Sequence, residues 1–196
     1  MKEAGDKAFA TGRLVRAKEA YQLALDALQG GDTAVTSTPP TADDDQLHLR
    51  VKVHANLAQT LLRLELPELA HRAAQAGLLV LLESSWSPHI TSIAPLRIKL
   101  LYRRALGLYR VGQYDLAMQA CEEAIRRCIA AAAADHADKN LNSSFSEGEA
   151  TALLERIKQR QLEAEQGPSA ETLRSLWESS VERQRASSPS SSPSFP

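Results

Sequence analysis

The sequence repeats itself at long range, and this repetition constrains the fold more than any other feature of the chain. A shift of 100 residues places small, apolar or aromatic positions on residues of the same kinds. The pairs are Gly5 with Ala105, Phe9 with Tyr109, Gly12 with Gly112, Ala17 with Ala117, Tyr21 with Cys121, Ala24 with Ala124 and Leu25 with Ile125. A shift of 47 likewise places Ala58, Leu61, Ala70, Ala74, Gly77 and Leu78 on residues of this last segment. Three units therefore begin near Met1, Val51 and Ile98.

Each unit has the pattern of two short amphipathic helices joined by a tight turn. In the third unit we expect a helix over about residues 95–110, a turn at Gly112 and a second helix from Tyr114. In the second unit Glu65 replaces the turn glycine, and Pro67 stands in the first turn of the next helix, where proline is favoured. Small residues such as Ala105 allow the two antiparallel helices to approach closely. The pattern predicts an all-α fold.

Two further helical patterns follow the third unit. "SEGEATALLERIKQRQLEAEQ" places Ala150, Leu153, Leu154 and Ile157 on one face, as expected of a helix that caps a repeat array. "SAETLRSLWESSVERQR" places Leu173, Leu176, Trp177 and Val181 at helical spacing, and we expect Trp177 to contact the cap rather than to bind a second partner. We therefore predict a domain at 1–166 with a capping helix at about 146–166, a short amphipathic helix at 167–186 and a disordered Ser/Pro tail at 187–196.

Composition and motifs exclude several functional classes. A net charge of −1 argues against nucleic-acid binding, and no run approaches the roughly 20 apolar residues of a membrane helix. Cys121 and Cys128 lie two helical turns apart, too far for a disulfide, and we expect them to be reduced. The sequence contains no phosphate loop, nucleophile elbow or metal-ligand spacing. We expect a cytoplasmic or nuclear protein that is not an enzyme and uses no cofactor or metal.

A stripe of polar residues follows one helical face in two units. The stripe consists of Lys99, Arg103, Leu106 and Arg110, and its counterpart 47 residues earlier consists of Lys52, Asn56, Gln59 and Arg63. Both advance by four, three and four residues, on the side opposite the packing Leu and Ala residues. Stacked units would bring Asn56, Lys99 and Arg103 into one groove with Lys2. Such a groove suits a ligand with two adjacent carboxylates, such as a C-terminal aspartate; the alternative is a solvated polar face.

The order of small residue, aromatic, glycine, alanine, aromatic and alanine resembles the tetratricopeptide repeat, whose period is about 34 residues. The spacings of 53 and 47 are longer, so insertions must separate the units. The segment "QGGDTAVTSTPPTADDD" reads as the first, an exposed loop, and "SSWSPHITSIA" as the second. The resemblance implies a right-handed superhelical array of three tetratricopeptide helix-turn-helix units, at about 1–30, 51–83 and 95–129, plus a C-terminal capping helix.

The stripe is similar to the dicarboxylate clamp of co-chaperone tetratricopeptide domains. These domains grip the C-terminal Glu-Glu-Val-Asp of the large cytosolic heat-shock chaperones. "KEAGD" places Lys2 at the first clamp position, Asn56 matches the second-repeat asparagine, and "KLLYRRA" supplies Lys99 and Arg103. Asp6 stands where the family has an asparagine. Because an ionised aspartate cannot donate a hydrogen bond and repels a carboxylate, we expect weakened or altered specificity.

The resemblance thus implies a protein–protein interaction module whose peptide-binding residues are Lys2, Asp6, Asn56, Lys99 and Arg103, with Arg63 and Arg110 at the periphery. The implied partner is a cytosolic heat-shock chaperone. Two alternatives stay open. The groove would take an unrelated peptide, or the chain would be the detached repeat portion of a peptidyl-prolyl isomerase, since the long first insertion resembles that of large immunophilins.

Overall fold

The computed structural model describes residues 1–30, 40–83, 93–134, 147–167 and 170–187. This part of the chain contains eight helices and no strand, so the prediction of an all-α fold is confirmed. The helices are α1 (Lys2–Ala10), α2 (Leu14–Gly30), α3 (Pro40–Arg63), α4 (Pro67–Glu83), α5 (Ile93–Val111), α6 (Tyr114–Ala134), α7 (Glu147–Gln166) and α8 (Ala170–Ser187). None of them is long and apolar enough to cross a membrane. The expected tail lies almost entirely outside the described residues.

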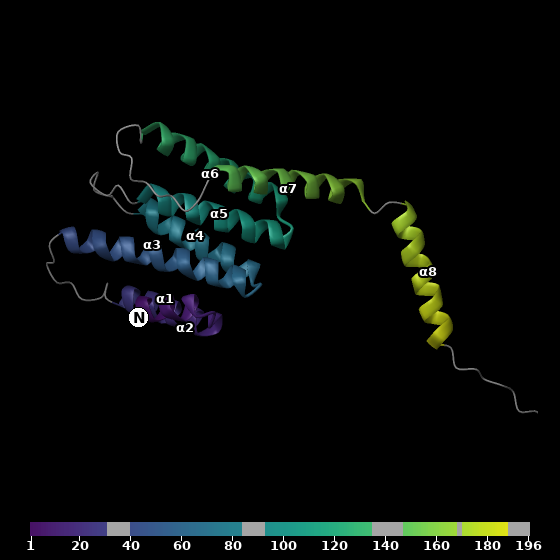
Figure 1. Cartoon of the computed structure of the whole chain (residues 1–196), viewed down its shortest axis with the longest axis horizontal. Helices are drawn as coiled ribbons and strands as arrows, with labels where there is room; N and C mark the ends of the chain where they lie inside the picture. Colours follow the sequence, from purple (N-terminus) through teal and green to yellow (C-terminus); the bar gives the residue numbers. More distant parts are fainter. Residues whose placement is uncertain (31–39, 84–92, 135–146, 168–169, 188–196) are drawn as a thin grey trace, which may run out of the picture. The chain divides into compact units, whose positions relative to one another are not determined.

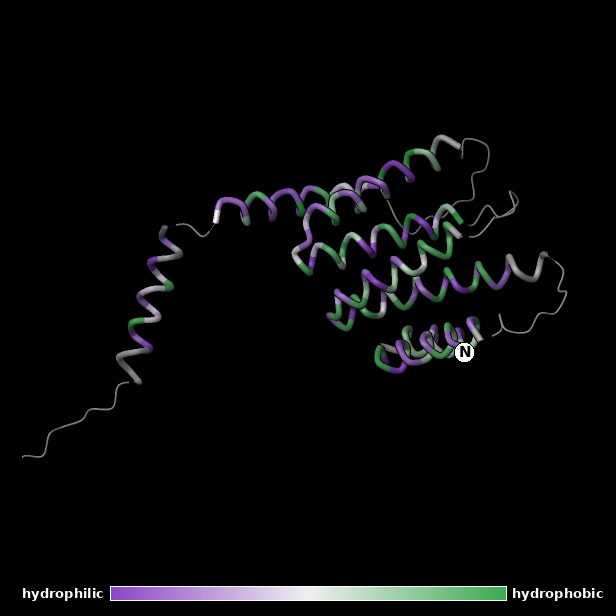
Figure 2. Tube along the Cα trace, turned by 180° about the vertical axis from the view of Figure 1, so that it is seen from behind, coloured by the Kyte–Doolittle hydropathy of each residue, from purple (hydrophilic) through white to green (hydrophobic). Residues whose placement is uncertain are grey.

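The chain divides into two compact units, Met1–Lys158 and Gln159–Pro196, and the boundary falls within α7. In the first unit the pairs α1–α2, α3–α4 and α5–α6 lie one above the other in chain order (Figure 1). The first helices of the pairs contact each other in succession, α1 with α3 and α3 with α5. Along these helices hydrophobic residues recur between polar ones, as expected when one face of each helix is buried (Figure 2).

The three turns within the pairs share one backbone geometry. Gly12, Glu65 and Gly112 each adopt a positive φ, of 73°, 58° and 85° respectively. In each turn the N–H of this residue donates to the carbonyl three residues earlier, and the next N–H donates to the carbonyl five residues earlier, at 2.9–3.3 Å. This pair of bonds is the Schellman motif that ends many helices. Glu65 therefore does occupy the position of a turn glycine, in a conformation that strains a residue with a side chain.

Helices extend into both segments that the sequence pattern predicted as insertions. We expected the segment ending at Asp45 to be an exposed loop, yet α2 runs to Gly30 and α3 already begins at Pro40. Likewise α5 begins at Ile93, within the second expected insertion. For α3 the physical reason is that proline is favoured in a first helical turn. The remaining residues of the two expected insertions, 31–39 and 84–92, lie outside the described part.

The core is shared between successive pairs and depends on small residues. One cluster joins Val51, Ala74, Leu78, Leu100 and Ala124, which come from α3, α4, α5 and α6. Alanines at the repeated positions 17, 58, 70, 105, 117 and 124 are all at most 1% exposed, as the repeat pattern predicted. At Gly5 an added Cβ would lie 2.6 Å from the ring of Tyr21, so only glycine admits that ring.

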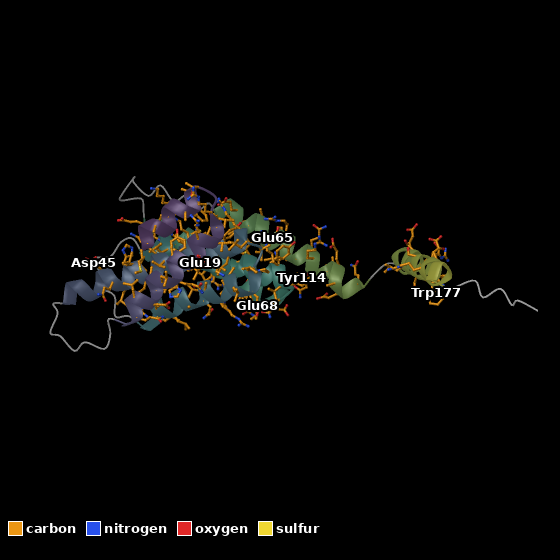
Figure 3. All side chains as sticks on the ribbon, turned by 90° about the horizontal axis from the view of Figure 1, so that it is seen from below. Glu19, Asp45, Glu65, Glu68, Tyr114 and Trp177 are labelled. Atoms are coloured by element: carbon orange, nitrogen blue, oxygen red, sulfur yellow. The ribbon has the colours of Figure 1, made fainter. Side chains whose placement is uncertain are left out.

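Helix α7 covers the last pair in the manner expected of a capping helix. Its stripe of Ala150, Leu153, Leu154 and Ile157 is at most 9% exposed and packs on α5 and α6. The buried thiol of Cys121 lies 3.6 Å from the carbonyl oxygen of Ala150, and burial raises its pKa to about 11. Both cysteines are free, as expected. Trp177 of α8 (labelled in Figure 3) lies in the second unit and is 72% exposed, and its expected contact with the cap stays a prediction.

We predict that Glu65→Gly stabilises the protein by about 1 kcal/mol, because glycine adopts the positive φ of this turn without steric strain. The measurement is urea unfolding followed by circular dichroism. Glu65→Ala is the control, since it removes the same charge and keeps the strain. Equal free energies of unfolding for the two variants would contradict the prediction.

A second prediction concerns His54, which is 7% exposed and has no hydrogen-bond partner at Nδ1 among the described residues. Burial, aided by the charge of Arg50, lowers its pKa from 6.5 to about 4. The folded protein therefore holds His54 neutral, and its stability should be fully present above pH 6.5 and fall between pH 6.5 and 4. The loss should be about 3 kcal/mol, at 1.36 kcal/mol per pKa unit.

The measurement is the free energy of unfolding across that pH range for wild type and His54→Leu. The variant should flatten the dependence. His48→Leu is the matched control on the same helix, because the pKa of His48 is also lowered by burial but less strongly. An unchanged pH dependence in His54→Leu would contradict this assignment.

Candidate peptide-binding site

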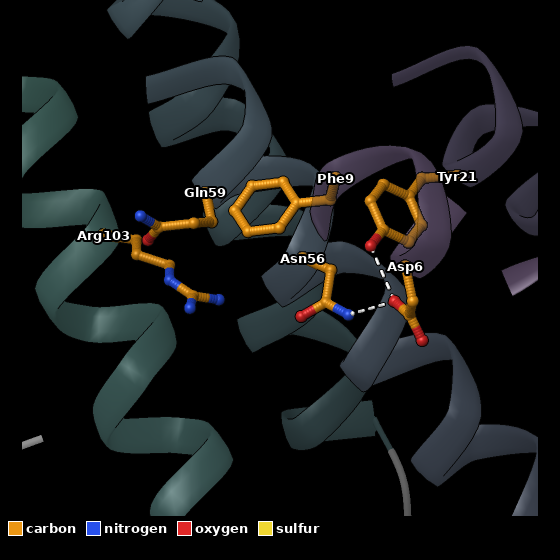
Figure 4. A pocket seen from close by; sticks show the side chains of 6 residues that line it. All are labelled: Asp6, Phe9, Tyr21, Asn56, Gln59 and Arg103. Carbon is orange, nitrogen blue, oxygen red and sulfur yellow. Dashed lines mark hydrogen bonds between the residues drawn. The ribbon is translucent and has the colours of Figure 1, made fainter. Parts of the chain in front are cut away.

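A pocket of about 130 Å³ lies where α1, α2, α3 and α5 meet. Its lining consists of Asp6 and Phe9 from α1, Tyr21 from α2, Asn56 and Gln59 from α3, and Arg103 from α5 (Figure 4). The lining thus combines a carboxylate, a guanidinium, two amides and two aromatic rings. A volume of this size accommodates one amino-acid side chain or the end of a peptide. The largely apolar lining with a few polar groups suits a ligand that has both apolar and polar parts.

Asp6 is held by donors from three helices. Lys2 Nζ lies 2.5 Å from Asp6 Oδ2, while the Tyr21 hydroxyl and Asn56 Nδ2 donate to Oδ1 at 2.6 and 3.0 Å. Burial by itself would raise the pKa of Asp6, but the hydrogen bonds from Lys2 and Tyr21 outweigh it and hold the pKa below 3.8. Asp6 is therefore an anion at neutral pH. Burial and the bond to Asp6 raise the pKa of Tyr21, which keeps its hydroxyl protonated.

The arginines of the polar stripe bind neighbouring helices. Arg103 donates to the carbonyl oxygen of Ala55 at 2.6 Å, and Arg110 donates to that of Leu62 at 2.8 Å, so two side chains of α5 hold the backbone of α3. The guanidinium carbon of Arg63 lies 4.4 Å from the ring centroid of Phe9, a cation–π contact from α3 to α1. Burial lowers the pKa of Arg103 to about 10, which leaves it charged at neutral pH.

These contacts correct our expectation that the stripe faces away from the packing residues. Leu106 packs against two core clusters, and Arg103 and Arg110 bridge two helices. The reason is that consecutive first helices of the pairs lie side by side, so a side chain on the face of one helix reaches the backbone of the next. Arg63 and Arg110 do not line the pocket.

The structure brings together most of the residues that the sequence singled out. Asp6, Asn56 and Arg103 line the pocket, and Lys2 joins it through its contact with Asp6. Lys99 does not line the pocket; it lies one turn before Arg103 on α5, half-buried, with no hydrogen-bond or ion-pair partner among the described residues. Lys99 is thus a cation near the pocket whose charge the described part of the protein does not neutralise.

Sequence reasoning missed the role of three lining residues. Phe9 and Tyr21 entered only as repeat aromatics and Gln59 only as a member of the stripe. A signal for Tyr21 exists in the sequence, since Gly5 breaks the alanine pattern of Ala58 and Ala105 and marks the place where a larger ring must fit. Within the described ranges, no three His, Cys, Asp or Glu side chains gather in a way that would hold a metal ion.

We predict that Tyr21→Phe destabilises the protein by about 1–2 kcal/mol, because it removes a hydrogen bond to a charged, partly buried group. The pKa of Asp6 should rise at the same time, since one donor to its ionised form is lost. Thermal and urea unfolding test the first effect, and NMR titration of the Asp6 carboxyl tests the second. Tyr114→Phe removes an equivalent hydroxyl away from the pocket and should change neither quantity.

The chain matches no protein-family model, no curated protein and no solved structure. The features of this chain that bear on function are therefore the pocket and the charges around it. Residues from positions as distant in the chain as Lys2 and Arg103 meet at one site, and an ionised carboxylate already occupies part of it.

Proposed function

We propose that this chain is a tetratricopeptide-type interaction module that binds an acidic peptide at the pocket between α1, α3 and α5. The proposal takes α1–α2, α3–α4 and α5–α6 as three repeat units in a right-handed superhelical array, with α7 as the cap. It is supported by the three Schellman turns at Gly12, Glu65 and Gly112, which recur at the spacings of 53 and 47 that separate the units.

The observation that carries the binding proposal is the meeting of Lys2, Asp6, Asn56 and Arg103 around one pocket. The spacing of these residues resembles that of a peptide clamp, and their meeting from three separate helices supports the proposal. Lys2, Lys99 and Arg103 carry three positive charges in this region against the one negative charge of Asp6. The excess favours an anionic ligand.

The first candidate ligand is the acidic C-terminal peptide of a cytosolic heat-shock chaperone, of the Glu-Glu-Val-Asp type. Lys99 and Arg103 would bind its acidic side chains, and the ring of Phe9 would contact its apolar residue. Charge-assisted hydrogen bonds contribute about 1.5–3 kcal/mol each, so a few of them give micromolar affinity after ordering costs. On this proposal the protein acts by docking a partner, with no catalytic step.

We predict micromolar binding of acetylated Met-Glu-Glu-Val-Asp, as free acid or C-terminal amide, measured by isothermal titration calorimetry. Lys99→Ala should weaken the binding by about tenfold or more, since Lys99 offers an unpaired charge to the ligand. Lys7→Ala is the matched control, because it removes one charge from an exposed position of α1. It should leave the affinity unchanged.

The neutral peptide acetyl-Met-Gln-Gln-Val-Asn-amide controls for charge and should not bind. The affinity for the acidic peptide should also fall as salt rises, as expected for a charge-driven contact at a partly exposed site. Binding of the neutral peptide with equal affinity would contradict an anion-selective site. Equal effects of Lys99→Ala and Lys7→Ala would place the peptide elsewhere on the protein.

A further inference from the structure

The Asp6 carboxylate lies between two of the expected peptide-binding residues, Lys2 and Asn56. Both already contact it, at 2.5 and 3.0 Å, so neither is free to hold a carboxylate of the ligand. The Tyr21 hydroxyl adds a third contact at 2.6 Å. The donors on this side of the pocket are therefore directed at an anion that belongs to the protein itself (Figure 4).

A second anion beside Asp6 would be repelled. A ligand carboxylate that bonded to Asn56 or Lys2 would come within about 4–5 Å of the Asp6 oxygens, where two like charges repel even under the screening of a partly wet site. The charge of Lys2 is balanced by Asp6, so it does not offset this repulsion. The cations that remain for a ligand are Arg103 and Lys99, both on α5.

Asp6 still offers an acceptor to a ligand. An ionised carboxylate accepts hydrogen bonds at about four positions, and three are used by Lys2, Tyr21 and Asn56. The Asp6 side chain is 39% exposed, so a ligand can reach it. The pocket thus presents an acceptor on the α1 side and cations on the α5 side.

We infer that the pocket selects an acidic peptide whose end or backbone is uncharged where it meets Asp6 and donates a hydrogen bond to that carboxylate. Arg103 and Lys99 bind an acidic side chain of the same peptide. A blocked C-terminus or a continuing peptide chain satisfies both requirements, because each supplies an N–H donor in place of a carboxylate. An internal acidic segment of a partner therefore fits the pocket better than a free C-terminus such as that of the first candidate ligand. Asp6 is then the residue that determines specificity, and this inference rests on the proposed function.

The test compares acetylated Met-Glu-Glu-Val-Asp as free acid with the same peptide as C-terminal amide, by calorimetry at neutral pH. Wild type should bind the amide about tenfold more tightly than the free acid. Asp6→Asn should bind the free acid at least as tightly as the amide, because asparagine removes the charge and adds a donor. Asp26→Asn, which removes one negative charge from an exposed position of α2, should keep the wild-type preference. Circular dichroism and thermal unfolding establish that each variant is folded.

The outcomes separate this inference from the proposed function. Wild type that binds the free acid as tightly as the amide, or more tightly, would overturn the inference and leave the acidic-peptide site standing. Wild type and Asp6→Asn that bind neither peptide would overturn the proposed function, and the inference with it. The wild-type comparison decides the matter by itself, so the test holds even if Asp6→Asn does not fold.

Discussion

The stability of this protein depends on the stacking of helix pairs, because no single pair encloses its own apolar residues. Val51 of α3 shares a core cluster with Leu100 of α5 and Ala124 of α6, and the clusters run without a break from the first pair to the second. Each helix pair therefore covers an apolar face of the preceding pair, and its own exposed apolar face is covered by the following pair. The last pair requires α7, whose buried Leu153 and Ile157 close the series. Close approach explains the small residues, since Gly5 and the buried alanines leave the space that neighbouring side chains fill.

The same stacking determines what the polar stripe does. Once α3 and α5 lie side by side, Arg103 and Arg110 reach backbone carbonyls of α3, and they link the two helices by charge-assisted hydrogen bonds. Arg63 of α3 likewise contacts the preceding pair, through its cation–π contact with the Phe9 ring of α1. The side chains of these arginines therefore make contacts within the protein instead of being fully solvated or fully available to a ligand. Arg103 has both roles, since it binds Ala55 and also lines the pocket, whereas Lys99 has no partner in the described part of the protein. This difference makes Lys99 the better residue for separating ligand binding from helix packing.

Asp6 connects the packing of the first pair to the chemistry of the pocket. Gly5 leaves the space that the Tyr21 ring fills, and the ring places its hydroxyl within hydrogen-bond distance of Asp6. Asn56 of α3 donates a further hydrogen bond to Asp6. The resulting hydrogen bonds hold three helices together and keep Asp6 ionised. The substitution Asp6→Asn would therefore change a structural contact as well as a binding group. The carboxylate that departs from the resembled clamp is thus well integrated in this fold, which is why we treat it as a determinant of specificity.

Local patterns in the sequence determined the helices, the turns and the small-residue positions. The repeated Gly12 and Gly112 located two turns, and the pattern also identified Glu65 as their equivalent, because backbone conformation depends on near neighbours. The capping helix was predicted within a residue at its start, since a lone amphipathic stripe after the last pair must be buried. The pattern did not predict the start of α3 at Pro40 or that of α5 at Ile93, because both lie in segments whose composition favours a loop.

The site was determined by the tertiary structure. The sequence pointed to Lys2, Asp6, Asn56 and Arg103, yet it did not show that Asn56 and Tyr21 would bind Asp6 or that the arginines would hold α3. Periodicity assigns residues to the faces of a helix, but the partners of a side chain depend on which helix lies beside it and at what distance. Those distances arise only when the pairs stack, and they decide which charges are neutralised within the protein and which are left for a ligand.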